Sequence, residues 1–223
     1  MNKEKDIINK VHCADCLGFM KTLPDNSVDL VLTDPPYGID IGKMSFTNSI
    51  IGGVAKRNNY KGISDWDKFT PSKEYFDEMI RISKKQVIFG GNYFADKLPP
   101  SGQWVVWDKR VEDKYSNDFA DCELAWTSEN KPSRIIRFLW SGMMQGDMKN
   151  KEVRFHPTQK PLFVIKKIID MFSEENDTIL DPFLGSGTTA IACKNLHRNF
   201  IGIEISEKYC KIARDRLRQQ TLI

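Results

Sequence analysis

Two short segments of the sequence combine residue types that could do chemistry, and the first is Asp34-Pro35-Pro36-Tyr37. It follows an apolar run, residues 28–33, that has the Val and Leu content of a buried parallel strand. Two consecutive prolines cannot continue a β-ladder, and they hold the backbone extended and rigid. An acid and an aromatic ring are therefore fixed where the strand ends, and ligands of open α/β sheets bind at the carboxyl ends of strands.

The chemistry of this first segment suits a planar base that carries an exocyclic amino group. The Asp34 carboxylate and a proline carbonyl can accept both hydrogens of that group, and proline has no N–H that would compete. Because the lone pair of the nitrogen is delocalised into the ring, two acceptors that pull its geometry towards tetrahedral would free it for attack. Tyr37 offers a stacking face, which is worth about 1–3 kcal/mol per base. The structural alternative is a plain turn.

The second segment runs from Asp181 to Thr189 and reads DPFLGSGTT, again after a strand-like run. Its glycines let the backbone approach a ligand, and the helix that follows presents an N-terminus that favours negative charge. A nucleoside triphosphate loop would need a lysine before the Ser/Thr, which this segment lacks. A dinucleotide fingerprint is matched only if Ala190 stands in for its last glycine, so that alternative stays open. Glu204 ends the next apolar run and could accept hydrogen bonds from both hydroxyls of a ribose, which predicts an adenosine-containing cofactor.

Alternating strands and helices position these two segments. Helical patterns are expected from Pro71 to about Ser83, over 162–172 after Pro161, from Gly187 to Leu196, and after Ser206. Strands are expected over seven runs: 28–34, 86–91, 103–109, 122–128, 133–140, 178–183 and 199–205. This alternation predicts an α/β fold, a doubly wound Rossmann-like sheet. Residues 40–69 and 142–156 do not fit this alternation of strands and helices.

Composition narrows the class of protein. The 223 residues suit a single α/β domain, and a net charge of +3 favours no partner by itself. A polar N-terminus and the lack of any run of about 18 apolar residues predict a soluble protein of a reducing compartment, the cytoplasm. Cys13 and Cys16 form a CxxC beside His12, but a zinc ribbon would need a second pair. We expect free thiols and no metal site.

Together, TDPPYG and DPFLGSGTT resemble the amino-methyltransferases of DNA that use S-adenosyl-L-methionine. The catalytic segment precedes the cofactor segment, which is similar to the circularly permuted group called the β class. Residues 156–161, HPTQKP, resemble the lead-in to the cofactor helix of that group, and residues 12–38 resemble its start. The resemblance covers about residues 11–40 and 154–217.

The resemblance implies a sheet of seven strands, the last antiparallel, and a target base that leaves the DNA stack. It implies four catalytic residues: Asp34, Pro35, Pro36 and Tyr37. The cofactor residues it implies are Asp15, Cys16, Thr158, Lys160, Asp181, Pro182, Phe183, Gly185, Ser186, Gly187, Thr188, Glu204 and Ile205. Asp at position 34 favours the N6 amino group of adenine; cytosine-N4 methylation, more often with Ser there, is the alternative. A non-catalytic DNA-binding protein and a dinucleotide-dependent oxidoreductase are the rivals from other classes.

The predicted partner is double-stranded DNA, held by one domain over 1–223. Within it, 40–70 would be a loop on the catalytic side and 128–155 a small insert for target recognition. Both are richer in basic side chains than the whole chain, and such side chains neutralise phosphates. The expected DNA-binding residues are Lys43, Lys56, Arg57, Lys61, Arg134, Lys149, Lys151 and Arg154. The family is often dimeric, and a restriction nuclease of the same system is a further expected partner.

Overall fold

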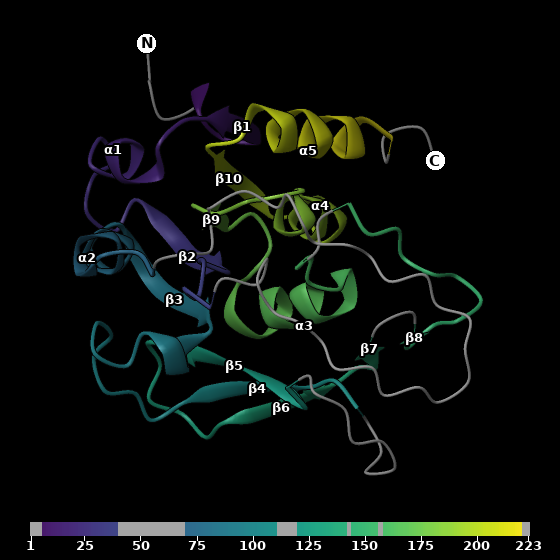
Figure 1. The fold of residues 1–223 in the computed structure, drawn as a ribbon. Helices are drawn as coiled ribbons and strands as arrows, with labels where there is room; N and C mark the ends of the chain where they lie inside the picture. Colours follow the sequence, from purple (N-terminus) through teal and green to yellow (C-terminus); the bar gives the residue numbers. More distant parts are fainter. Residues whose placement is uncertain (1–5, 40–69, 111–119, 142–143, 156–157, 220–223) are drawn as a thin grey trace.

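A single mixed sheet forms the centre of the molecule in the computed structural model, which describes residues 6–39, 70–110, 120–141, 144–155 and 158–219. The strands lie in the order β1-β10-β9-β2-β3-β5-β4-β6 (Figure 1). Their bounds are β1 Lys10–Cys13, β2 Val28–Thr33, β3 Ser83–Phe89, β4 Trp104–Asp108, β5 Cys122–Thr127, β6 Arg134–Arg137, β9 Thr178–Asp181 and β10 Asn199–Glu204. A separate two-stranded hairpin consists of β7 Trp140–Ser141 and β8 Met144–Gln145.

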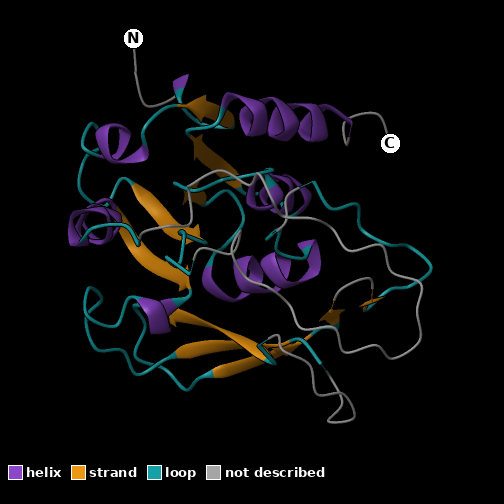
Figure 2. Ribbon diagram, viewed as in Figure 1, coloured by secondary structure: helices purple, strands orange, loops and turns teal. Residues whose placement is uncertain are grey.

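Helices cover both faces of this sheet (Figures 1 and 2). On one face, α1 (Cys16–Met20) and α2 (Lys73–Ile82) bury Met20, Phe76 and Met79 in one core. On the other face lie α3 (Leu162–Phe172), α4 (Thr188–Asn195) and α5 (Glu207–Gln219), which form a second core. A short 3₁₀ helix, η4 (Gly91–Tyr93), follows β3. Two cores on opposite faces confirm the doubly wound α/β fold.

The apolar pattern of the central strands follows from this double cover. In β2, Leu30 and Leu32 enter the core beneath α3, and Val31 enters the core beneath α1 and α2. All three side chains are fully buried, which explains why the strand is a continuous apolar run rather than an alternating one. In α3, Ile165 and Ile169 share the buried face, as helical spacing predicts.

Each predicted strand and helix forms within a few residues of its expected position, but three details needed correction. In the described part of the chain the main sheet has eight strands rather than seven, because β6 adds to its edge beside β4. The antiparallel strand is β5, which lies inside the sheet between β3 and β4 and is not the last in the chain. The first strand, β1, was missing from the predicted runs; it pairs in parallel with β10.

The sheet order brings the two chemical segments together. β2 and β9 are parallel neighbours, with Leu30 opposite Ile179 and Val31 opposite Leu180. Their carboxyl ends therefore meet at one edge of the sheet, where Asp34 follows β2 and Asp181 ends β9. Among the described residues, no helix is both long and apolar enough to cross a membrane.

Candidate active site

A cavity of about 350 Å³ opens at the carboxyl ends of β2, β9 and β10. This size suits a small-molecule ligand. Of the catalytic residues, Asp34 and Pro36 line it. Every cofactor residue expected from the sequence lines it except Gly187. The lining residues that the sequence did not assign to the site are Ala14, Leu32, Thr33, Tyr75, Phe89, Gln159, Ile165, Leu184, Thr189, Ser206 and Tyr209.

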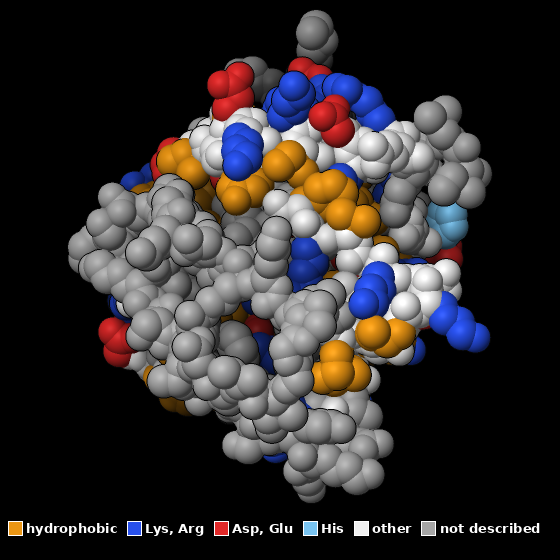
Figure 3. All heavy atoms as spheres, turned by 45° about the vertical axis from the view of Figure 1, so that its right-hand side comes forward, with side chains coloured by type: hydrophobic (Ala, Val, Ile, Leu, Met, Phe, Trp, Pro, Cys, Tyr) orange, Lys and Arg blue, Asp and Glu red, His pale blue; other side chains and the backbone are white. Residues whose placement is uncertain are grey.

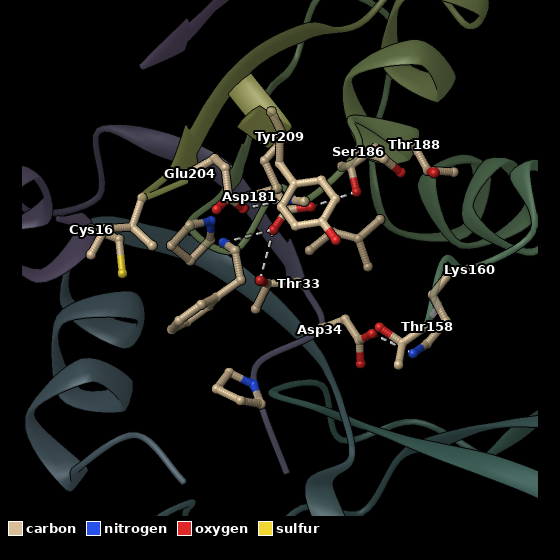
Figure 4. A pocket seen from close by; sticks show the side chains of 18 of the residues that line it. Cys16, Thr33, Asp34, Thr158, Lys160, Asp181, Ser186, Thr188, Glu204 and Tyr209 are labelled. Atoms are coloured by element: carbon tan, nitrogen blue, oxygen red, sulfur yellow. Dashed lines mark hydrogen bonds and ion pairs between the residues drawn. The ribbon is translucent and has the colours of Figure 1, made fainter. Parts of the chain in front are cut away.

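Asp181 ties the two motif strands together at the centre of the cavity wall (Figure 4). Thr33 at the end of β2 donates to Asp181 Oδ1 at 2.7 Å, and Thr189 of α4 donates to Oδ2 at 2.6 Å. The backbone N–H of Phe183 adds a third hydrogen bond, at 3.1 Å. Burial raises the pKa of the Asp181 carboxyl to about 6, although these three donors act in the opposite direction.

Two glycines of the loop serve different purposes. Gly185 has a φ of 55°, and a Cβ built on it would meet no atom within 4 Å, so its backbone borders open space at the cavity. Gly187 has a φ of 89°, and a Cβ there would lie 2.8 Å from Cβ of Ala213 in α5. The first glycine thus leaves room beside the ligand site, whereas the second lets the start of α4 pack on α5.

Glu204 organises the opposite end of the cavity. Its Oε2 accepts the backbone N–H of Gly185 at 2.9 Å, and its Oε1 accepts that of Ser206 at 2.8 Å. Each carboxylate oxygen keeps a second lone pair, so both can still accept a hydroxyl of a ligand. The carboxylate is therefore held in place by backbone donors on both sides.

The neighbouring wall is formed by α1 and its cap. The Asp15 side chain caps α1 by accepting the N–H of Gly18 at 2.7 Å. Burial and the Asp15 charge raise the pKa of the Cys16 thiol to about 12, so this thiol stays protonated and acts as an apolar contact. Phe183 lies across from Tyr75, with ring centroids 6.2 Å apart. This end offers apolar and aromatic contacts that suit a purine ring.

Lys160 lies at the other end of the cavity, against the catalytic segment. Its ammonium group forms an ion pair with Asp34 Oδ2, as Figure 4 shows, and lies 3.1 Å from Glu123 Oε2. Its side chain is only 8% exposed. Burial disfavours the charged ammonium, yet the two carboxylates hold the pKa of Lys160 above its usual value. The residue expected at the cofactor is thus paired with Asp34, the residue expected to be catalytic.

Glu123 and Lys109 complete this group of buried charges. Lys109, directly after β4, pairs with Glu123 Oε1 at 2.5 Å. Burial would raise the pKa of Glu123, but Lys160 and Lys109 outweigh it and keep that pKa below its usual value. For Asp34 the balance is reversed: burial raises the pKa of its carboxyl more than Lys160 lowers it.

Tyr37 differs from its expected role in one respect. Its hydroxyl donates to Asp34 Oδ1 at 2.6 Å. Tyr37 therefore contacts Asp34 through its hydroxyl, in addition to the stacking role expected of its ring. The ring stacks on Tyr93, with centroids 4.8 Å apart and planes 15° from parallel. Gly90, at a φ of 72°, lets the ring approach so closely that a Cβ would lie 2.2 Å from it. Tyr93 covers one face of the ring, so a base can stack on that face only if Tyr93 moves.

The expected DNA-binding residues divide into two groups. Lys43, Lys56, Arg57 and Lys61 lie outside the described residues. Arg134 is exposed on the edge strand β6, and Lys149 and Lys151 are exposed after β8. Arg154 is exposed and stacks over the ring of Trp140 at 4.2 Å. On the face drawn in Figure 3, Lys and Arg side chains lie among exposed hydrophobic ones.

Comparisons with known proteins identify the family. The model of the DNA methylase family N6_N4_Mtase matches residues 104–215, half of the chain. The Type II methyltransferase M.HinfI of Haemophilus influenzae is 31% identical, over 96% of this chain and 69% of that protein. The chain belongs to this DNA methylase family.

Solved structures agree with this assignment. The crystal structure of an M1.HpyAVI–SAM complex is 25% identical with a TM-score of 0.52, covering 93% of this methylase and 98% of that chain. The cytosine-N4-specific PvuII DNA methyltransferase, 15% identical with a TM-score of 0.59 over 92% of this chain and 85% of that one, shows the same fold. Family membership and fold confirm the predicted enzyme class, a site-specific DNA methyltransferase.

Three side chains of the methylase that support the site were missed from the sequence. Glu123 and Tyr93 lie in the middle region, which carries no motif. Arg216 of α5 donates to the backbone oxygen of Ser186 in the glycine loop at 2.7 Å. Ser186 in turn donates to Gln159 Oε1 at 3.1 Å, and Gln159 lies inside HPTQKP, which could have indicated it.

Proposed function

We propose that this methylase transfers a methyl group from S-adenosyl-L-methionine to the exocyclic N6 amino group of adenine in DNA. The observation that carries the proposal is the position of Asp34. Its carboxylate lies at the wall of the cavity, on the strand next to the one that carries Asp181 and the glycine loop. The acceptor of an amino group and the site of an adenosine-containing ligand therefore share one space.

The residues of the cavity fit that cofactor. Glu204 has lone pairs for both ribose hydroxyls, and Cys16 and Phe183 offer contacts for the adenine ring. Asp181 and Asp34 place negative charge where a positively charged sulfur would be stabilised. The solved M1.HpyAVI–SAM complex shows that a relative of similar fold binds this molecule. When bound, the cofactor supplies an electrophilic methyl group.

The residues after β2 act on the base. The Asp34 carboxylate and a carbonyl of Pro35 or Pro36 accept the two hydrogens of the amino group, which localises its lone pair towards the methyl group. The base must leave the helix first, since its amino group is otherwise paired and its ring stacked. Stacking on the Tyr37 ring offsets part of this cost. Asp at position 34 favours adenine over cytosine, whose N4 amino group would need the same chemistry.

Other expected features join the proposal. The basic residues Arg134, Lys149, Lys151 and Arg154 contact DNA phosphates, and 128–155 contributes to target recognition through its hairpin β7–β8. The order of the two motifs supports the β class. The relatives named Type II methyltransferases support a partner restriction nuclease. A homodimer and, given a DNA substrate, a cytoplasmic location complete the proposal.

The test is to express the chain in a strain that methylates no DNA. Digested host DNA should contain N6-methyladenine by mass spectrometry, and none in cells that express Asp34→Ala. Sequencing with base modifications read out should place the methylated adenines in one short motif. N4-methylcytosine as the sole product would refute the choice of adenine, and an unmodified genome with folded protein present would refute the activity.

A further inference from the structure

The acceptor on which the proposed function rests already has one donor on each of its oxygens. Asp34 Oδ1 accepts the Tyr37 hydroxyl at 2.6 Å, and Oδ2 is paired with the Lys160 ammonium. Each oxygen keeps a second lone pair, but the ammonium on Oδ2 offsets the negative charge with which Asp34 would stabilise an amino group that becomes positive during methyl transfer. The shortest route to a fully charged acceptor is for Lys160 to loosen its contact with Asp34.

Lys160 cannot leave without a second anion. Its side chain is 8% exposed, and leaving a buried ammonium without a partner strongly destabilises the folded protein. Glu123 Oε2 lies 3.1 Å from the same nitrogen and has no other partner among the residues described. This oxygen therefore has acceptor capacity in reserve, directed at the ion that has to move.

The remaining contacts of Glu123 make it a stable receiver. Its other oxygen is fixed by Lys109 at 2.5 Å. Glu123 lies on β5 and Lys109 after β4, and these strands pair with Trp107 opposite Glu123. The carboxylate is thus held by the sheet itself, while Lys160 comes from the segment that precedes α3.

We propose that Glu123 is a positioning residue that takes over the Lys160 ammonium when the amino group of the base binds Asp34. The ammonium needs to shift only between two carboxylates that it already contacts. Once it pairs with Glu123, Asp34 keeps a full negative charge and a free lone pair towards the amino nitrogen, on which positive charge develops as the methyl group is transferred. Lys160 itself acts as the positioning cation that keeps Asp34 ionised in the free enzyme.

The proposal predicts pH effects of opposite sign. The groups that face Asp34 are Tyr37 in its own loop, Lys160, Glu123 with its partner Lys109, and Asp181 on β9. Lys160 lowers the pKa of Asp34 and Glu123 raises it. Lys160→Met should therefore move the acidic limb of the kcat/KM profile to higher pH. Glu123→Gln should move it to lower pH, because the neighbouring negative charge is gone.

The experiment measures methyl transfer from labelled cofactor to unmethylated DNA, across pH, for Glu123→Gln and Lys160→Met. For Glu123→Gln we expect kcat at the optimum to fall at least tenfold, since Lys160 then stays on Asp34, with cofactor affinity unchanged within about threefold. Lys160→Arg should recover part of the activity that Lys160→Met loses. Glu129→Gln, two residues after β5 and paired with Lys131, and the exposed Lys84→Met are matched controls that should retain the wild-type profile.

A second measurement does not depend on turnover. The carboxyl carbon of Asp34, followed by ¹³C NMR in the free protein, should titrate at higher pH in Lys160→Met and at lower pH in Glu123→Gln. Limbs or titrations that shift in the same direction, or a Glu123→Gln enzyme with wild-type kcat, would overturn the inference. The product of the wild-type protein is measured in the same assay. If the wild type methylates no adenine, the proposed function is refuted instead.

Discussion

The two ends of the cavity hold their carboxylates in different ways. At the cofactor end, the donors to Asp181 and Glu204 in the described part of the chain are neutral hydroxyls and backbone N–H groups of adjoining elements. At the catalytic end, Asp34 and Glu123 face the charged side chains of Lys160 and Lys109. Neutral donors fixed by the sheet and helix ends make a site that is formed before the ligand arrives. Ion pairs between flexible side chains make a site whose partners can be exchanged.

Removing one acid from each end tests most directly whether the two ends of the cavity act separately. Asp34→Ala should lower the rate of methyl transfer by about a thousandfold or more, because the amino group loses its charged acceptor, an effect of about 4 kcal/mol. Cofactor affinity, measured by calorimetry, should change less than threefold. A loss of cofactor binding equal to that of an Asp181 variant would show that the two ends are one unit.

The converse change is Asp181→Ala. It removes the hydrogen bonds that Thr33, Thr189 and Phe183 donate, so the glycine loop loses its anchor to β2. We expect cofactor affinity to fall at least a hundredfold in calorimetry, with circular dichroism of the fold retained. Asp181→Asn, which keeps the shape and an acceptor oxygen, is the control and should lose far less. Equal losses in both variants would assign the effect to charge rather than to the anchor.

Asp34 and Asp181 were predictable from the sequence, but the ionic partners of Asp34 were not. Asp34, Asp181 and Glu204 each follow or end an apolar run, and the carboxyl ends of parallel strands meet at one edge. Glu123 lies on a strand of no distinct motif. It reaches Lys160 only because β5 inserts in antiparallel direction between β3 and β4, a pairing that local patterns do not encode.

The same limit explains which contacts of Lys160 and Tyr37 the sequence did not predict. The motif HPTQKP placed Lys160 at the cavity but could not tell which end it faces. Tyr37 was assigned a stacking role by its ring, whereas its hydroxyl bond to Asp34 depends on the loop conformation after the prolines. Tyr93 and Gly90, which cover that ring, come from the turn after β3, far from the motif in sequence.

Tyr37 tests whether the catalytic end depends on a face or on a charge network. Tyr37→Ala should lower activity about ten- to a hundredfold, from the ~1–3 kcal/mol of lost stacking on the base. Tyr37→Phe keeps the ring and should retain activity within about tenfold, with an acidic limb moved to higher pH because one donor to Asp34 is gone. Cofactor affinity should stay constant in both. If Tyr37→Phe is as inactive as Tyr37→Ala, the hydroxyl rather than the ring face carries the role.

The burial of Asp181 predicts a pH dependence of stability. Burial raises the pKa of this carboxyl from 3.8 to about 6, so the folded protein binds its proton more tightly than the unfolded chain does. That contribution is present below about pH 4 and is lost as pH rises to about 6, a change on the order of 3 kcal/mol. Relative to Asp181→Asn, the wild type should therefore lose free energy of unfolding across this range in urea titrations. A constant difference from pH 4 to 7 would contradict it.

The smallest expected effect concerns the surface beyond the catalytic end. Lys149, Lys151 and Arg154 are exposed in one short segment, and Arg154 is supported by the ring of Trp140. Exposed cations that neutralise phosphates release counterions, so their contribution depends on salt and not on DNA sequence. Replacing all three by Ala should weaken DNA binding several-fold at moderate salt, alike for specific and unrelated duplexes. It should also reduce the slope of log K against log salt by up to about 3.

The matched control removes the same charge elsewhere. Lys73, Lys84 and Lys211 are exposed on α2, β3 and α5, outside the segment 144–155. Their triple Ala variant should keep the wild-type slope, because a phosphate contact is local whereas net charge is not. Fluorescence anisotropy from 50 to 300 mM salt, without and with cofactor, gives both slopes. If the two triple variants lose slope equally, the effect belongs to net charge, and the segment after β8 is ordinary surface. If only the Lys149, Lys151 and Arg154 variant loses slope, DNA lies along the catalytic end, beside the ion pairs of Asp34 and Glu123.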